Sequence, residues 1–420
     1  MKILWIVNTI FPYPSKKLNI ENTVFGGWLN GLAERMSKNE QVELGVATTY
    51  KINKVLDLKN ERIRYFIIPN KKQNQKYWKE IIDKFQPDLI HLHGTEYSHG
   101  WQLMSENKKY KIPIITSIQG LVYRYADVYL ANIDNKEIIK NITFRDILKN
   151  DSMFKQKKKF INKGKIEKKI IENSDIITGR TTWDYANTYS IKPDINYYLV
   201  NEILRSSFYY DKWDITKIER HSVFTSQGQY PIKGLHYLLK TIYILKKIYP
   251  DVKLYVGGVN IIDSTTIFKK IKLIGYAKYI KKSIKRYNLE ENIIFTGLLN
   301  EKQIKEKLLR TNVFVLPSAI ENSSNSLGEA MILGMPCVAT NTGGTMDILK
   351  HKKEGFLYPY TEPAMCAEYI KRFFEDDELC KIYGEEARKT ALERHDPEKN
   401  VKELIEIYKK TIKNKELECL

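Results

Sequence analysis

The sequence predicts an α/β protein built from two doubly wound domains, each with a parallel sheet. Short apolar segments alternate with segments whose apolar residues recur at helical spacing, a pattern typical of parallel strands joined by crossover helices. The chain has 420 residues, which is too long for one ordinary core and suits two domains of about 200 residues each. The alternation restarts after residues 200–215, where we place the junction between the domains.

The first half of the chain contains seven apolar segments of strand length. Between them, residues 27–38 and 77–85 carry apolar side chains at helical spacing and are expected helices. The first segment becomes polar at Asn8 and two prolines follow, so we interpret it as a strand and not as a signal peptide. The expected strands are residues 2–8, 42–50, 62–69, 88–94, 113–120, 175–180 and 196–202.

The second half repeats this rhythm, with a long helical pattern at residues 235–250. Its expected strands are residues 222–230, 252–258, 292–297, 313–318, 336–340 and 354–360. A final helix at residues 397–412 has apolar residues on one face, and its spacing alone indicates only an amphipathic helix. That face consists of Val401, Leu404, Ile405, Tyr408 and Ile412.

The chain is strongly basic. Its 69 Lys and Arg against 50 Asp and Glu give a net charge of +19, which predicts attraction to an anionic partner. Residues 131–170 hold twelve basic and five acidic residues, and aromatic residues such as Phe144, Phe154 and Phe160 lie among them. This composition suits an anionic membrane surface, with lysines that merely solvate helices as an equal alternative. Nucleic acid is disfavoured because no binding motif accompanies the charge.

The four cysteines show no metal-ligand spacing, which favours reduced thiols in a cytoplasmic protein; they are Cys337, Cys366, Cys380 and Cys419. His91 and His93 alternate on an expected strand, so both could face one zinc ion. No convincing third ligand is apparent, and we expect no metal.

Two glutamates carry the strongest functional signal. Glu321 and Glu329 are separated by seven small or polar residues, between an expected strand and an expected helix. Such a loop lies at the carboxyl edge of a parallel sheet, where the helix directs free N–H groups toward a phosphate. The carboxylates suit sugar hydroxyls beside that phosphate, so the segment predicts a sugar-nucleotide site. The alternative is two surface glutamates beside a helix start.

Lys233 and a glycine pair supply further candidates for binding a diphosphate. Lys233 follows an expected strand and precedes an expected helix that begins near Gly234, so its charge adds to that of the helix end. Gly26 and Gly27 precede another helix and let the backbone approach an anion closely. The alternatives are a solvated lysine and an ordinary turn.

Together these motifs resemble the retaining glycosyltransferases of family four, which share a GT-B fold and a Glu, seven residues, Glu motif. The similarity extends over most of the chain, through residues 26–36, 87–94, 112–121, 230–242, 291–300 and 340–349. It implies two Rossmann-like domains whose parallel sheets face across a cleft, with the C-terminal helix crossing back to the N-terminal domain. We therefore expect an acceptor domain at residues 1–205, joined by the helix at 398–420, and a nucleotide-sugar donor domain at 206–397.

The resemblance also implies the reaction and the partners. The enzyme would move a sugar from a UDP- or GDP-linked donor to a hydroxyl acceptor with retention, without a metal or other cofactor. The acceptor would be a glycan or a lipid-linked or surface polysaccharide intermediate, handled in the cytoplasm at the inner face of the membrane. The alternatives are a catalytically impaired GT-B protein that binds sugar nucleotides, and a GT-B nucleotide-sugar epimerase.

Individual residues take roles from the resemblance. Lys233 would hold the diphosphate, Glu329 the ribose and Glu321 the transferred sugar. His93 would line the acceptor side. The backbone at the remaining donor positions would contact the nucleotide: Gly26, Gly27, Gly297, Asn325, Ser326 and Leu327.

Two glutamines depart from the family pattern. Gln227 stands where many relatives place an arginine, so one charge on the phosphates is lost unless Arg180 or Arg205 replaces it. Gln119 stands where relatives often place a histidine, and an amide cannot accept the proton of the acceptor. Gln119 would instead orient the sugar or the acceptor, while the departing phosphate oxygen takes that proton.

Overall fold

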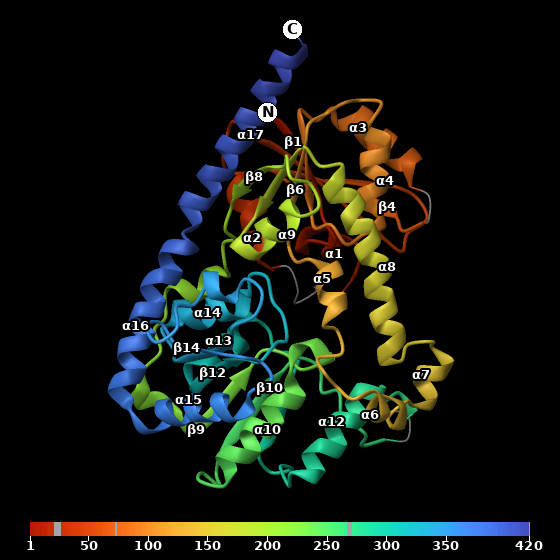
Figure 1. Cartoon of the computed structure of the whole chain (residues 1–420). Helices are drawn as coiled ribbons and strands as arrows, with labels where there is room; N and C mark the ends of the chain where they lie inside the picture. Colours follow the sequence, from red (N-terminus) through yellow and green to blue (C-terminus); the bar gives the residue numbers. More distant parts are fainter. Residues whose placement is uncertain (21–26, 72–73, 267–270, 420) are drawn as a thin grey trace. The chain divides into compact units, whose positions relative to one another are not determined.

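The computed structural model describes residues 1–20, 27–71, 74–266 and 271–419 (Figure 1). The chain forms two compact units, each with its own sheet. Unit 1 comprises Met1–Tyr123, Asn162–Arg205 and His395–Leu420. Unit 2 comprises Arg124–Ile161 and Ser206–Arg394.

Unit 1 contains an eight-stranded sheet in the order β3-β4-β2-β1-β5-β6-β7-β8. Its strands are β1 (Lys2–Ile6), β2 (Glu43–Tyr50), β3 (Leu56–Lys59), β4 (Ile63–Pro69), β5 (Leu89–His93), β6 (Ile114–Ser117), β7 (Ile176–Gly179) and β8 (Asn196–Leu199). Every segment expected to be a strand contains one, and all neighbours are parallel except β3 and β4. The sequence analysis missed β3, a four-residue edge strand whose Asp57 pairs with Arg64 of β4 at 2.8 Å.

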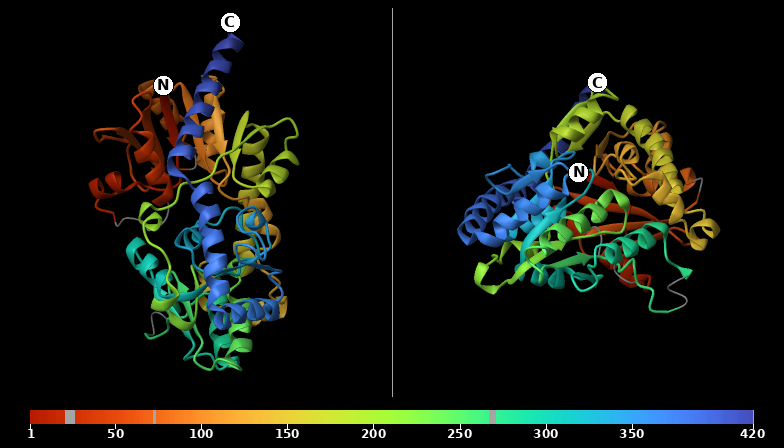
Figure 2. Two further views of the ribbon diagram at one scale, coloured as in Figure 1. Left: turned by 90° about the vertical axis from the view of Figure 1, so that its left-hand side faces the viewer. Right: turned by 60° about the horizontal axis from the view of Figure 1, so that its bottom comes forward.

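Helices cover both faces of this sheet, as two views of the ribbon show (Figures 1 and 2). They are α1 (Pro12–Lys17), α2 (Gly27–Met36), α3 (Gln75–Phe85), α4 (Ser98–Asn107), α5 (Val122–Asp127), α8 (Met153–Glu172), α9 (Thr182–Tyr189) and α17 (Pro397–Cys419). The chain passes between the units within α5 and again within α8.

The C-terminal helix α17 belongs to unit 1, as the GT-B resemblance implies. Its apolar face packs into the same core as α2 and β1, where Leu404 and Tyr408 are almost fully buried. The Tyr408 hydroxyl accepts a hydrogen bond from the Trp5 indole N–H at 3.0 Å and lies 2.5 Å from Nδ1 of His91. The His91 ring continues to Ser117, 2.6 Å from its Nε2, so one buried chain of hydrogen bonds ties α17 to three strands.

Unit 2 contains a six-stranded, fully parallel sheet in the order β11-β10-β9-β12-β13-β14. Its strands are β9 (Glu219–Thr225), β10 (Lys253–Gly257), β11 (Ile293–Gly297), β12 (Thr311–Leu316), β13 (Cys337–Thr340) and β14 (Phe356–Tyr358). Each overlaps an expected segment, although β9 and β12 begin before theirs. Its helices are α6 (Asn135–Lys140), α7 (Phe144–Leu148), α10 (Leu235–Lys246), α12 (Gly275–Arg286), α13 (Glu301–Leu309), α14 (Asn325–Leu333), α15 (Pro363–Glu375) and α16 (Asp377–Arg394).

Residues 124–161 cluster with unit 2, whereas the sequence analysis placed them in the first domain. Two buried hydrogen bonds fix this segment to unit 2. The Gly275 N–H at the start of α12 donates to Asp146 at 2.9 Å, and Nε2 of His236 on α10 lies 3.0 Å from the Ala131 carbonyl. Neither contact has a signal in the local sequence, because each partner is more than a hundred residues away.

No described helix combines the length and the apolar character that crossing a membrane requires. Three cysteines, Cys337, Cys366 and Cys380, are free and buried, and burial raises the pKa of the Cys366 thiol to about 12.

The substitution Tyr408→Phe should reduce the free energy of unfolding by about 1–3 kcal/mol, because it leaves the Trp5 N–H and the His91 ring without their buried partner. Urea denaturation followed by circular dichroism measures the change. Tyr210→Phe is the control, since that side chain is 84% exposed. Equal stability of both variants would contradict a structural role for the network.

Candidate functional site

The carboxyl edge of the unit 2 sheet is built from three loops that follow β9, β12 and β13. The loops bond to one another through their backbones. The Ala319 N–H donates to the Ile232 carbonyl at 2.8 Å, and the Gly344 N–H donates to the Glu321 carbonyl at 2.9 Å. The Thr340 hydroxyl adds a bond to the Ser318 carbonyl at 2.7 Å. Hydrogen bonds therefore join the three loops along this edge.

Two glycines permit this close approach. Gly234 has a φ of +71°, and a Cβ there would lie 1.8 Å from the Pro317 carbonyl oxygen. Gly343 has a φ of +58°, and a Cβ there would lie 1.9 Å from the Glu321 carbonyl oxygen. Any other residue would combine backbone strain with a clash against main chain.

Lys233 and Glu321 come together at the centre of this edge. Nζ of Lys233 lies 2.6 Å from Oε1 of Glu321, and the Ser318 hydroxyl donates to the same oxygen at 2.7 Å. Both side chains are mostly buried, with exposed fractions of 21% for Lys233 and 12% for Glu321. Lys233, the cation predicted to bind a phosphate, is thus in direct contact with Glu321, the carboxylate predicted to bind a sugar.

Helix α14 begins beside them. Its N-cap is Ser324, whose hydroxyl accepts from the Leu327 N–H at 3.4 Å, and the Ser226 hydroxyl from the loop after β9 donates to Ser326 at 3.0 Å. Oδ1 of Asn325 is buried and has no hydrogen-bond partner within the described ranges. The start of α14 therefore offers first-turn N–H groups to an anion, and the Asn325 Oδ1 beside them can accept a hydrogen bond from a hydroxyl.

The remaining predicted donor residues differ in what they present. Glu329 lies one turn further along α14 and is 4% exposed. Leu327 is fully buried, so its side chain contributes packing to α14. Gly297 ends β11 with a φ of +75° and no described heavy atom within 4 Å of a Cβ position. Open space there suits a flat group lying against the backbone.

Gln227 lies near the end of β10, where its Cβ is 4.0 Å from the Cβ position of Gly258. Its amide can form hydrogen bonds but cannot replace the charge of an arginine. Arg180, considered as a substitute, is 7% exposed in unit 1 and paired with Glu202 at 3.2 Å. The Arg180 guanidinium is therefore already paired with a carboxylate of its own unit.

Unit 1 places His93 and Gln119 at the carboxyl ends of adjacent strands, β5 and β6. His93 is 3% exposed, and neither ring nitrogen has a hydrogen-bond partner among the described residues. Burial, together with unfavourable electrostatic interactions with His91 and Arg180, holds the pKa of His93 well below its ordinary value, so the ring is neutral. Nε2 of Gln119 is likewise buried without a partner in the described chain.

The glycine pair before α2 is only partly described. Gly27 is the first residue of α2, where Cδ of Arg205 lies 3.7 Å from its Cβ position. Gly26 lies outside the described residues.

The histidines do not form a metal site. Both ring nitrogens of His91 are already bonded, to Tyr408 and Ser117, and burial lowers its pKa to about 3. Across the described ranges, no group of three or more His, Cys, Asp or Glu side chains is placed to hold a metal ion.

The sequence analysis missed a buried carboxylate that bonds to Thr95, just after β5. Glu167 of α8 is fully buried and accepts from the Thr95 hydroxyl at 2.7 Å and the Tyr123 N–H at 2.8 Å. Burial raises its pKa to about 7. Glu167 lies among lysines in the sequence, so it looked like a surface residue. The signal that could have found it is its spacing: it precedes the buried Ile170 and Ile171 by three and four residues, which places all three on one helix face.

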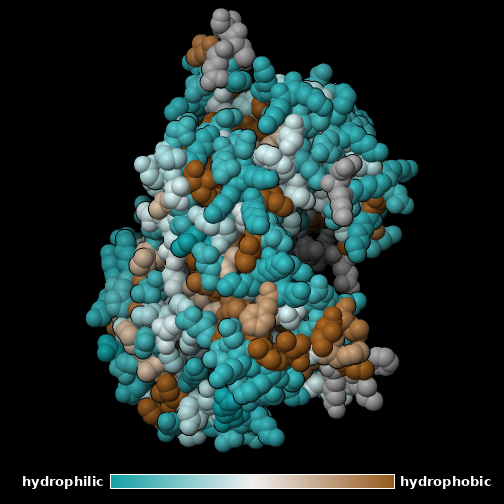
Figure 3. Space-filling model, turned by 45° about the vertical axis from the view of Figure 1, so that its right-hand side comes forward, coloured by the Kyte–Doolittle hydropathy of each residue, from teal (hydrophilic) through white to brown (hydrophobic). Residues whose placement is uncertain are grey.

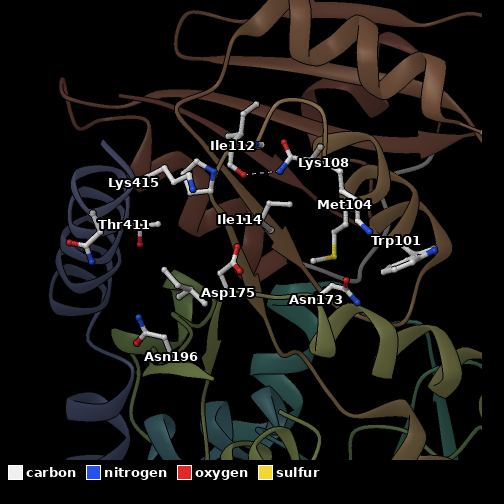
Figure 4. A pocket seen from close by; sticks show the side chains of 15 residues that line it. Trp101, Met104, Lys108, Ile112, Ile114, Asn173, Asp175, Asn196, Thr411 and Lys415 are labelled. Atoms are coloured by element: carbon white, nitrogen blue, oxygen red, sulfur yellow. Dashed lines mark hydrogen bonds between the residues drawn. The ribbon is translucent and has the colours of Figure 1, made fainter. Parts of the chain in front are cut away.

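A separate pocket lies at the opposite edge of the unit 1 sheet (Figure 4). Its walls include Ile112, Asp175 and Asn196, which precede or begin β6, β7 and β8, together with Thr411 of α17. Ligands of parallel sheets bind at the carboxyl ends of strands, so this pocket is not part of the candidate site.

Comparison with known proteins identifies relatives. Residues 211–390 match the family model described as glycosyl transferases group 1. The chain is 26% identical over 205 residues to the uncharacterized glycosyltransferase YqgM of Bacillus subtilis, covering 49% of this chain and 53% of that protein. It is 24% identical over 242 residues to N-acetyl-alpha-D-glucosaminyl L-malate synthase of Bacillus anthracis, covering 57% and 60%. The matches thus span little more than half the length of these relatives.

Solved structures share the whole fold. Sucrose-phosphate synthase from Thermosynechococcus elongatus has a TM-score of 0.69 at 15% identity, covering 98% of each chain. Anabaena Alr3699/HepE in complex with UDP-glucose has a TM-score of 0.68 at 15% identity, covering 98% of this chain and 100% of that chain. The protein therefore has the GT-B fold, and residues 211–390 are similar to glycosyl transferases group 1.

Gly343→Ala should destabilise the protein more than Gly297→Ala, because both have positive φ but only Gly343 faces a backbone oxygen, 1.9 Å from its Cβ position. We expect about 1–2 kcal/mol for the backbone strain in each variant and a further loss at Gly343 from displacement of the Glu321 loop. Chemical denaturation compares the two. Equal losses would show that the loop shifts without cost.

Glu167→Gln should change how stability depends on pH. Because the pKa of Glu167 rises from 4.5 to about 7 on folding, its protonated form stabilises the parent below pH 4.5, and that contribution is lost as the pH rises through about 7. Relative to the parent, the variant should gain about 3 kcal/mol between about pH 4 and about pH 8. Denaturation across this range tests the slope, with the exposed Glu61→Gln as control. Parallel curves for parent and variant would contradict the raised pKa.

Proposed function

We propose that this protein is a retaining glycosyltransferase of family four that transfers a sugar from a UDP- or GDP-linked donor to a hydroxyl acceptor. The observation that carries the proposal is the contact of Lys233 with Glu321, 2.6 Å apart beside the start of α14. A cation, a carboxylate and helix N–H groups at one sheet edge match the diphosphate and the hydroxyls of a sugar nucleotide. HepE, which shares the fold, is described with UDP-glucose bound.

Each group at this edge has a chemical task in the proposal. As the bond from the anomeric carbon to the phosphate oxygen breaks, negative charge grows on the diphosphate. Lys233 and the first N–H groups of α14 stabilise that charge. Glu321 accepts hydrogen bonds from hydroxyls of the transferred sugar, and Glu329 holds the ribose. The backbone near Gly297 lies against the base of the nucleotide.

The acceptor oxygen then forms its bond to the anomeric carbon on the face that the diphosphate leaves. Its proton passes to the departing phosphate oxygen, which suits a chain whose Gln119 amide cannot accept one. His93 is neutral and buried, so it lines the acceptor side without carrying charge. No metal takes part in these steps.

We further propose that the acceptor is a glycan or a lipid-linked or surface polysaccharide intermediate, handled at the inner face of the membrane. The basic character of the chain, with a net charge of +19, supports an acceptor or a surface that carries negative charge.

A second candidate is a GT-B protein that binds sugar nucleotides without transferring the sugar. The glutamines at positions 227 and 119 favour it, because both remove groups that relatives use. Slow hydrolysis of the sugar nucleotide without acceptor separates the two candidates, since a pure binder releases no free sugar.

Lys233→Gln and Glu329→Gln should each weaken binding of the matching sugar nucleotide by about tenfold to a hundredfold, since each removes a charged hydrogen bond to the donor. Thermal-shift screening of the parent against UDP- and GDP-sugars identifies that donor, because a ligand at about 100 times its dissociation constant stabilises the fold by about 2.7 kcal/mol. Calorimetric titration then measures each variant.

Lys240→Gln is the matched control, because this lysine of α10 lies over the Tyr237 ring and outside the three loops. Unchanged donor affinity and turnover in Lys233→Gln and Glu329→Gln would contradict the assignment of the site.

A further inference from the structure

Two short helices of unit 2 hold large apolar side chains out into solvent. Ile139 of α6 is 60% exposed, and Phe144, Ile147 and Leu148 of α7 are 67%, 70% and 66% exposed. All four fall within ten residues of sequence. We call them the apolar patch; hydrophobic residues gather toward the lower right of the space-filling view, in the region of α6 and α7 (Figure 3).

The segment that carries the apolar patch is firmly anchored. Ile138 is fully buried between the exposed positions, and Asp134 caps α6 by accepting from the Lys136 N–H at 2.6 Å. Thr143 and Asp146 form a capping box at the start of α7, and Asp146 also bonds to α12. The exposed side chains therefore sit on a fixed support, and their exposure is not fraying of a loose end.

Basic side chains surround the apolar patch. Residues 131–161 contain eight basic and four acidic residues. Helix α12 lies beside this segment, because Nζ of Lys278 donates to the Lys140 carbonyl at 3.3 Å. This helix contains five basic residues and no acidic one. The acidic side chains are largely occupied: Glu137 pairs with Lys140, and Asp151 pairs with Arg145 and Lys159. The segment therefore keeps a net positive charge, with exposed lysines at 136, 149 and 158, and the neighbouring helix α12 carries exposed lysines at 281, 282 and 285.

We propose that the apolar patch docks on the surface of an anionic lipid bilayer. The aliphatic and aromatic side chains would enter the boundary between headgroups and acyl chains, while the lysines around them contact the phosphates. Exposed apolar side chains that cluster inside a charged rim mark interaction surfaces. The membrane is favoured over a second copy of this chain, because a twofold contact would bring two strongly basic rims together.

This surface concerns unit 2 alone and does not depend on the sugar-transfer reaction. It assigns the membrane contact to α6 and α7, whereas the sequence indicated the broader basic region of residues 131–170 with the aromatic residues in it. A protein anchored there would meet acceptors that are themselves carried in the bilayer.

Vesicle flotation tests the proposal. The full chain is mixed with vesicles of phosphatidylcholine alone, or with about a third phosphatidylglycerol, at low and at physiological salt. We expect binding to the anionic vesicles that weakens as salt rises. The double variant Phe144→Gln with Ile147→Gln should lower that binding by about tenfold or more, because it removes two side chains that would leave water. Both positions are exposed, so the fold should survive.

The control is Ile248→Gln with Ile382→Gln, which removes two similarly exposed apolar side chains of unit 2 outside the apolar patch. It should bind like the parent. Lys136→Glu with Lys149→Glu should also weaken binding to anionic vesicles and reduce its dependence on salt.

Three results would overturn the proposal: no vesicle binding by the parent, equal binding by the Phe144 and Ile147 variant, or equal binding to neutral and anionic vesicles. A parent that self-associates through the apolar patch, with a monomeric double variant, would assign the surface to a second copy instead. Donor-induced thermal shifts are recorded for every variant. If the chain binds vesicles but no sugar nucleotide raises its melting temperature, the proposed reaction is contradicted while the proposed membrane surface is supported.

Discussion

The contact between Lys233 and Glu321 depends on how closely three loops of unit 2 approach one another. The loop after β12 carries Glu321, whose backbone carbonyl accepts a hydrogen bond from the Gly344 N–H. This close contact is possible because Gly343 has no side chain, which would otherwise clash with the same carbonyl. The loop after β9 presents Lys233 under the same condition at Gly234, which lies against the Pro317 carbonyl. Backbone hydrogen bonds and the two glycines thus bring together the loops that carry the ion pair.

Much of this architecture was predictable from local patterns. The strands of unit 2 and seven of the eight in unit 1 are short apolar runs between turns. Most of them are buried on both sheet faces, which makes the signal strong, whereas the edge strands β8 and β11 are only partly buried. The apolar face of α17 was also readable, because Leu404 and Tyr408 follow helical spacing into the core. Lys233, Glu321 and the start of α14 were found because strand ends of a parallel sheet converge on one edge.

What the sequence did not reveal depends on partners far away along the chain. Residues 124–161 join unit 2 through bonds to α10 and α12, and nothing in their composition distinguishes them from a segment of unit 1. In the sequence, His91 looks like one ligand of a metal site, but in the structure its Nδ1 is bonded to the Tyr408 hydroxyl. Glu167 looks like a surface residue of a lysine-rich helix, but it is buried. In each case the sequence supplies the side chain but not its neighbour.

The pre-formed pairing of Lys233 bears on selectivity. A lysine whose charge is already balanced by a carboxylate attracts a lone anion only weakly, because capturing that anion means giving up Glu321. Free phosphate and similar ions abundant in a cell would thus compete poorly. A molecule that offers negative oxygens to the lysine and hydroxyl donors to the released carboxylate compensates both partners at once, so this arrangement would reject incomplete ligands before any chemistry begins.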